Sequence, residues 1–110
     1  MKVKFYLTTS GRSPIEEFLQ EISAEARGEV FDAIALLASG QSLSMPLSRN
    51  LSSIRPGLHE LRIKDRAGQV RVFYFIKRGD AIYLVHAMRK KTQEIPKKDI
   101  ELILKRTKEI

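Results

Sequence analysis

The sequence predicts one α+β domain in which two N-terminal helices and a C-terminal helix pack with a mainly antiparallel, four-stranded sheet. The helix and strand patterns are segregated rather than alternating, in the order strand, helix, helix, three strands, helix. Short turns join the last three strands, as is typical of an antiparallel meander. We therefore expect a single domain over residues 1–110, with the helices on one face of the sheet. It would fold without disulfides, because the chain has no cysteine.

The N-terminal part has clear start and stop signals. Alternating apolar and polar residues from Lys2 to Thr8 predict the first strand. Ser13, followed by proline and with Glu16 three positions later, predicts the start of a helix. Ser23 is the expected N-cap of a second helix, and Gly40 its end. The expected apolar stripes are Ile15, Phe18, Leu19 and Ile22 in the first helix and Val30, Phe31, Ile34, Leu37 and Ala38 in the second.

The C-terminal part is interpreted as a loop, a meander and a helix. Residues 41–57 are rich in serine and show no sustained period, so we expect a long loop. Strands begin at Leu58, with turns over residues 65–68 and 77–80, and the last helix begins at Pro96 with Ile100, Ile103 and Leu104 on one side. A symmetric first turn would place Arg62 opposite Arg71, Ile63 opposite Val70 and Leu61 opposite Val72.

One face of the meander carries an unexpected mixture of side chains. Alternation directs Arg71, Phe73 and Phe75 away from the helices, together with Glu60 and Arg62. Like charges opposite one another and exposed phenylalanines are both unfavourable, and a bound nucleic acid would relieve both through its phosphates and stacked bases. The alternative is that the C-terminal helix or the loop covers the phenylalanines and that Arg71 pairs with Glu60.

Charge is distributed unevenly along the chain. The net charge is +7, and residues 1–55 hold six basic and six acidic groups, so residues 56–110, with fourteen and seven, carry all of it. This asymmetry favours a nucleic-acid partner over a membrane, since no basic amphipathic helix with a bulky aromatic face occurs. A merely basic surface is the alternative. With no apolar run of membrane length and no signal-like N-terminus, we expect a cytoplasmic location.

The end of the third meander strand adds further candidates. Arg89, Lys90 and Lys91 follow one another, so alternation brings at least one of them to the substrate face. His86 could act as an acid or base because its ordinary pKa is near neutrality. It could equally be a core histidine, since it shares the parity of Leu84.

Three motifs between Gly57 and Glu101, ELRIK, GQVRVFYF and HAMRKKT, closely resemble the RelE/ParE toxin superfamily, in particular its HigB-like and phage-derived members. The resemblance implies a RelE-like fold and a toxin of a type II toxin–antitoxin system. Such a toxin inhibits translation by cleaving messenger RNA in the ribosomal A site. Its partners would be the ribosome, the message and a cognate antitoxin, expected to be a HigA-like helix-turn-helix protein, with no membrane involved.

By motif position, the resemblance assigns catalysis to Arg62, Lys64, Arg71, Lys90 and Lys91, and HigB-like members add His86. The tyrosine that RelE-type enzymes use has no counterpart in residues 93–99. RNA contacts are expected from other basic and aromatic side chains of the same half: Arg66, Phe73, Phe75, Arg89, Lys97 and Lys98.

The residue types themselves permit RNA cleavage by attack of the 2′-OH on the adjacent phosphate. Arginine stabilises charge on the phosphorane, and a lysine can take a proton when burial or neighbouring cations lower its pKa. Lys64, beside Arg62 and Arg71, is the lysine expected to be crowded in this way. The scheme requires no metal and no cofactor. Two alternatives are a ParE-like poison of DNA gyrase on the same fold and a non-catalytic nucleic-acid-binding module.

Overall fold

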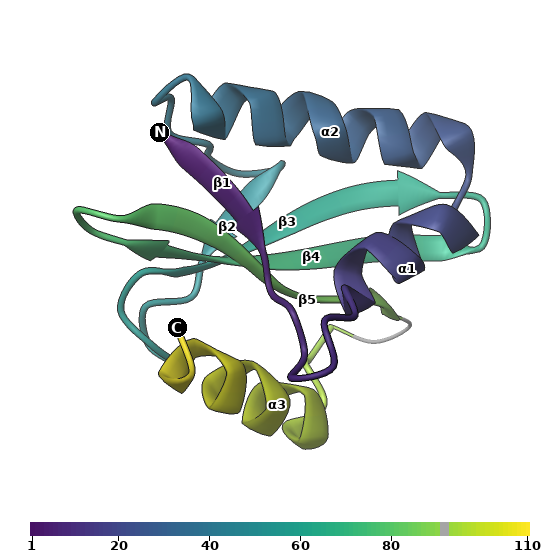
Figure 1. The fold of residues 1–110 in the computed structure, drawn as a ribbon. Helices are drawn as coiled ribbons and strands as arrows, with labels where there is room; N and C mark the ends of the chain where they lie inside the picture. Colours follow the sequence, from purple (N-terminus) through teal and green to yellow (C-terminus); the bar gives the residue numbers. More distant parts are fainter. Residues whose placement is uncertain (91–92) are drawn as a thin grey trace.

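The computed structural model describes residues 1–90 and 93–110, and in these ranges three helices enclose one sheet from two sides (Figure 1). No helix within the described ranges has the length and apolar character needed to cross a membrane. The elements in chain order are β1 (Lys2–Phe5), α1 (Pro14–Glu21), α2 (Ala24–Ala38), β2 (Ser48–Asn50), β3 (Leu58–Asp65), β4 (Gly68–Lys77), β5 (Ala81–Lys90) and α3 (Lys97–Lys108).

The sheet is mixed, with the strand order β1-β5-β4-β3-β2. β1 runs parallel to β5, and the other neighbours are antiparallel. The α+β class is confirmed, but the prediction of four strands is wrong because β2 forms a fifth within the expected loop. Its three residues are too few for alternation to be recognised in the sequence. β1 also ends at Phe5, three residues before the predicted end.

The pairing of β3 with β4 has the predicted register. Ile63 pairs with Val70 and Arg62 pairs with Arg71. Between β4 and β5 the register shifts, and a bulge leaves Val85 unpaired between the neighbouring pairs.

The bulge determines the side of the sheet on which His86 lies. Before the shift Phe73 pairs with His86, and after it Tyr74 pairs with Leu84. His86 and Leu84 therefore lie on opposite faces of the sheet, although they are two residues apart.

The two faces have separate cores. The helices α1 and α2 cover one face, where Leu19 and Val30 pack against Val72. The helix α3 covers the other face, where Ile103 packs with Phe73, and Figure 1 shows α3 across the sheet from α1 and α2. The expectation that all helices lie on one face is wrong, because the phenylalanines of β4 form an apolar surface that α3 buries.

The predicted helix starts are confirmed by hydrogen bonds. The hydroxyl of Ser13 accepts from the amide of Glu16, and that of Ser23 accepts from the amide of Ala26. The apolar stripe of α2 is narrower than predicted, and Phe31 is 45% exposed. The buried positions follow a single helical row that excludes it: Ala26, Val30, Ala33 and Leu37.

Candidate functional site

The α3-side face of the sheet changes from apolar to cationic toward the β3–β4 turn. Paired residues of adjacent strands share a face, so the register arranges their side chains in rows. Successive rows toward the turn hold Arg49, Glu60, Phe73 and His86, then Arg62, Arg71 and Met88, then Lys64, Gln69 and Lys90. The cation cluster, as we call it, consists of Glu60 at the inner end of these rows and their five lysine and arginine residues: Arg49, Arg62, Lys64, Arg71 and Lys90.

Glu60 and Arg71 form a buried ion pair at the centre of the cluster. Glu60 is fully buried and Arg71 is 2% exposed, and Nη1 of Arg71 lies 2.8 Å from Oε1 of Glu60. Nε of Arg62 lies 4.0 Å from the same oxygen, so one carboxylate faces two opposed guanidinium groups and reduces their repulsion. The alternative in which Arg71 pairs with Glu60 is confirmed, and the expected exposed position of Arg71 is wrong.

The ion pair leaves polar atoms of the cluster without hydrogen bonds. Within residues 1–90 and 93–110, neither carboxylate oxygen of Glu60 accepts a hydrogen bond, and Nε of Arg71 donates none. Nη2 of Arg71 does donate to Oε1 of Gln69 at 2.5 Å. The carboxylate of Glu60 is therefore held by the charges of Arg71 and Arg62 rather than by aligned hydrogen bonds.

Lys90 is the crowded lysine of the site. It is 5% exposed, and its Nζ donates to the backbone carbonyl of Gln93. Burial lowers the pKa of Lys90, the guanidinium of Arg71 lowers it further, and Glu60 raises it less. The prediction assigned this crowding to Lys64, whose side chain is exposed.

His86 forms a half-buried pair with α3. Its Nε2 lies 2.8 Å from Oδ1 of Asp99, in the first turn of α3, and its ring stacks on Phe73 at 5.8 Å between centroids. Burial lowers the pKa of His86, the hydrogen bond to Asp99 raises it, and the charge of Arg106 lowers it. Asp99 was not among the predicted residues, since its contact depends on where α3 packs.

The prediction that Phe73 and Phe75 are exposed and can contact RNA bases is wrong. Phe73 is fully buried and Phe75 is 8% exposed, both in the core under α3. The guanidinium of Arg55 lies over the Phe75 ring at 5.1 Å. The alternative that α3 covers these rings is confirmed, so bases cannot stack on them in this structure.

The other predicted RNA contacts lie outside the cluster. Arg89 faces the α1 and α2 side, where its Nη1 lies 2.6 Å from Oδ2 of Asp65. Arg66 is exposed in the β3–β4 turn, and Lys97 and Lys98 are exposed in the first turn of α3. Lys91 lies outside the described residues.

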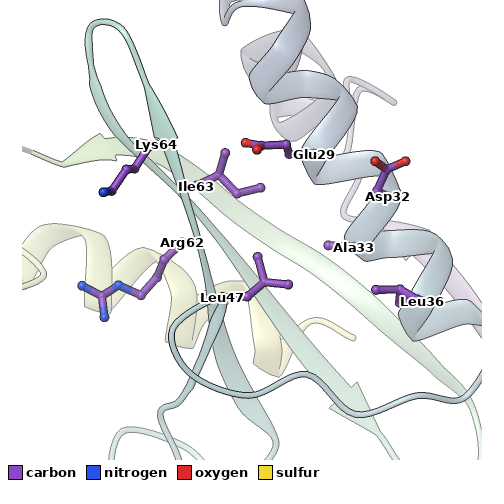
Figure 2. A pocket seen from close by; sticks show the side chains of 8 residues that line it. All are labelled: Glu29, Asp32, Ala33, Leu36, Leu47, Arg62, Ile63 and Lys64. Atoms are coloured by element: carbon purple, nitrogen blue, oxygen red, sulfur yellow. The ribbon is translucent and has the colours of Figure 1, made fainter.

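Two accessible cations of the cluster, Arg62 and Lys64, line two adjoining hollows. One, of about 360 Å³, lies between α2 and β3, and the other, of about 400 Å³, lies beside Pro46 and Gln69. Arg62, Lys64 and Leu47 line both. Figure 2 shows the side chains of Arg62 and Lys64 on the side of β3 away from α2. The cluster thus has a buried part, Arg71 with Lys90, and an open part, Arg62 and Lys64 beside the hollows and Arg49 on β2.

Arg49 and Gln69 belong to the cluster but were not predicted. Arg49 lies opposite Glu60 on β2, and its charge contributes to lowering the pKa of Lys90. A three-residue strand gives no periodic signal, so the sequence alone could not place it. Gln69 has the parity of Arg71 on β4, and this alternation could have identified it.

A family model described as "Phage derived protein Gp49-like (DUF891)" matches residues 17–108. The chain belongs to this family. It is a toxin-like family of the RelE/HigB type, and the match includes every residue of the cation cluster. A comparison with curated proteins gives no match. The family match agrees with the resemblance carried by the three motifs of β3, β4 and β5.

Proposed function

We propose that this Gp49-like protein is the toxin of a toxin–antitoxin pair, and that it inhibits translation in the cytoplasm by cleaving messenger RNA on the ribosome. The observation that carries the proposal is the clustering of five cations on one face at the open end of the sheet, two of them, Arg62 and Arg71, beside the carboxylate of Glu60. Such a site suits a single phosphate whose charge increases during reaction. The accessible part of the site is small, so the ribosome would have to present the message to it.

The proposed reaction uses the substrate's own hydroxyl. The 2′-oxygen attacks the adjacent phosphorus, the bond from phosphorus to the 5′-oxygen breaks, and the products carry a 2′,3′-cyclic phosphate and a 5′-hydroxyl. Arg62 and Lys64 would hold the phosphate, because they are the accessible cations beside the hollows. The step needs no metal and no cofactor.

The buried groups of the site would have different tasks. Glu60 would position both Arg62 and Arg71, and Arg71 would add positive potential behind the phosphate. Lys90 and His86 would transfer protons, since both lie on the same face of the sheet as Arg62 and Lys64 and burial lowers the pKa of each. Two such groups satisfy the need for one base at the 2′-OH and one acid at the 5′-oxygen.

Toeprinting on translating ribosomes tests the proposal. The wild type should cut the message at A-site codons, and an Arg62→Ala/Lys64→Ala variant should cut at least about a hundredfold more slowly. A Lys105→Ala/Lys108→Ala variant is the matched control, since it removes the same charge from exposed positions of α3. Intact messages on stalled ribosomes would contradict the proposal. Unchanged translation with inhibited gyrase would favour the ParE-like function instead.

A further inference from the structure

The edge of β3 is open beyond the short strand β2. β2 pairs only with residues 59–61, and the last bond to this edge runs from the amide of Arg62 to the carbonyl of Leu47 at 2.8 Å. By the two-residue repeat of a strand, the N–H and C=O of Lys64 point to the same edge. In the part of the chain that the structure describes, no strand pairs with β3 there. Such an edge is a template for another strand.

The hollow of about 360 Å³ between α2 and β3 lies directly beside this edge. We call it the edge groove. Its floor is apolar, formed by Ala33 and Leu36 of α2 with Leu47 and Ile63, and Leu36 is 38% exposed. Figure 2 shows Ile63 and Leu47 directed toward α2 across the groove. The groove therefore offers an unfilled apolar surface to a side chain from outside.

A strand added to this edge would meet different chemistry on its two sides. Successive side chains of a strand point to opposite faces. On the α2 side they would meet Leu36 and Ile63, and on the other side they would meet Arg62 and Lys64. Apolar residues therefore fit the first set of positions and carboxylates the second.

The groove fits a polypeptide better than a nucleic acid. Glu29 and Asp32 line its α2 wall and would repel a phosphate backbone. The open N–H and C=O of Lys64 are satisfied by a peptide backbone that pairs as a strand. The chain itself leaves this position at Pro46, which has no N–H to donate.

We propose that the edge groove binds an extended segment of a partner protein, in which apolar and acidic residues alternate, and that this segment adds to the sheet beside β3. The carboxylates of the segment would cover Arg62 and Lys64. The inference deepens the proposed function, on which it rests for one consequence only: a toxin with these two cations covered would no longer cleave RNA.

Titration of the ¹⁵N-labelled protein with a capped synthetic peptide, Ac-Ile-Glu-Ile-Glu-Ile-amide, tests the inference without ribosomes. We expect saturable shifts of the amide signals of Leu47, Ile63 and Lys64 in the millimolar range. A Leu36→Glu variant should bind at least about tenfold more weakly. Phe31→Glu is the matched control, since it places the same charge at an exposed apolar position of α2 outside the groove and should bind normally.

Two altered probes identify the mode of binding. The same peptide with an N-methyl group on the amide that faces Lys64 should lose binding, and Ac-Ile-Lys-Ile-Lys-Ile-amide should not bind. Absence of shifts at these amides, equal binding of the lysine peptide, or equal loss in the two α2 variants would overturn the inference. So would a short oligouridylate that shifts the groove amides when the acidic peptide does not. If the nuclease assay fails, the peptide result still stands, because it measures binding alone.

Discussion

The buried carboxylate of Glu60 lies between two guanidinium groups that face each other across β3 and β4. Alternation predicted that Arg62 and Arg71 are opposite one another, and it identified Glu60 as a partner for Arg71. It did not predict that the pair is buried, because burial depends on α3 and the neighbouring strands. Arg49, Arg62 and Lys64 reach solvent, while Arg71 is buried.

Removal of Glu60 alone should destabilise the protein strongly. A Glu60→Leu variant leaves the charge of Arg71 buried without its partner, so we expect a loss of about 3–5 kcal/mol in the free energy of unfolding. A Glu60→Leu/Arg71→Met variant removes both charges and should recover most of this loss. Urea denaturation of the two variants and the wild type provides the measurement. If the double variant lost the sum of the two single effects, the ion pair would not be the origin of the loss.

The pair of His86 with Asp99 makes a prediction about pH. Burial lowers the pKa of His86 below its ordinary 6.5, so the unfolded chain binds a proton at a higher pH than the folded one. The free energy of unfolding should therefore fall as the pH drops below 6.5, by at most about 1.4 kcal/mol for each unit of pKa difference. Asp65 and Asp80 titrate below this window, since their pKa values lie under 3.8.

Denaturation over a pH series checks this prediction with two variants. His86→Gln should reduce the dependence below pH 6.5, and the contribution of His59 should remain. His59→Gln is the comparison, because burial also lowers the pKa of His59 and its contribution has the same sign. An NMR titration that placed the pKa of His86 above 6.5 would show that Asp99 outweighs burial and would contradict the prediction.

At the level of elements, the sequence predicted what local signals determine and missed what tertiary packing determines. The caps at Ser13 and Ser23 and the β3–β4 register follow from short-range patterns, and the structure confirms them. The bulge at Val85 has no local signal, and it reverses the side on which His86 lies. The position of α3 depends on the apolar surface of β4, so the sequence could state it only as an alternative.

The cap at Ser23 should matter more for stability than the cap at Ser13. The Ser23 hydroxyl accepts from the amide of Ala26 at 3.1 Å, and its interaction with the carboxylate of Asp65, at the end of β3, lowers the pKa of Asp65. We expect Ser23→Ala to cost about 1–2 kcal/mol and Ser13→Ala, whose bond is longer and exposed, less than about 1 kcal/mol. If thermal or urea denaturation gave equal losses of stability for the two variants, the contact with Asp65 would not add to the stability of the cap at Ser23.

At the scale of the whole molecule, the uneven charge along the chain places most of the basic residues on one part of the structure. The C-terminal half that carries the +7 contains β3, β4 and β5, and so most of the cation cluster. Arg71 and Arg89 of this half nonetheless form ion pairs, with Glu60 and Asp65. Net charge alone therefore overstates the surface that a polyanion meets.

Ribosome binding should show this difference in its dependence on salt. Each phosphate contact contributes about one unit to the slope of log K against log salt, so Arg62→Ala/Lys64→Ala should reduce the slope by about two. Lys105→Ala/Lys108→Ala should leave it nearly unchanged. Equal reductions in both variants, measured by sedimentation with ribosomes over a salt series, would mean that overall charge and not the cluster governs binding.

The most direct test of the central claim is the cleavage of a message that carries a single 2′-deoxynucleotide at the expected cut in the ribosomal A site. The wild type should cut the all-RNA message to a 2′,3′-cyclic phosphate and a 5′-hydroxyl, and should leave the deoxy-substituted message intact at that position. Equal cutting of both messages would contradict attack by the 2′-OH, and intact all-RNA message on ribosomes that have stopped translating would contradict the nuclease function itself.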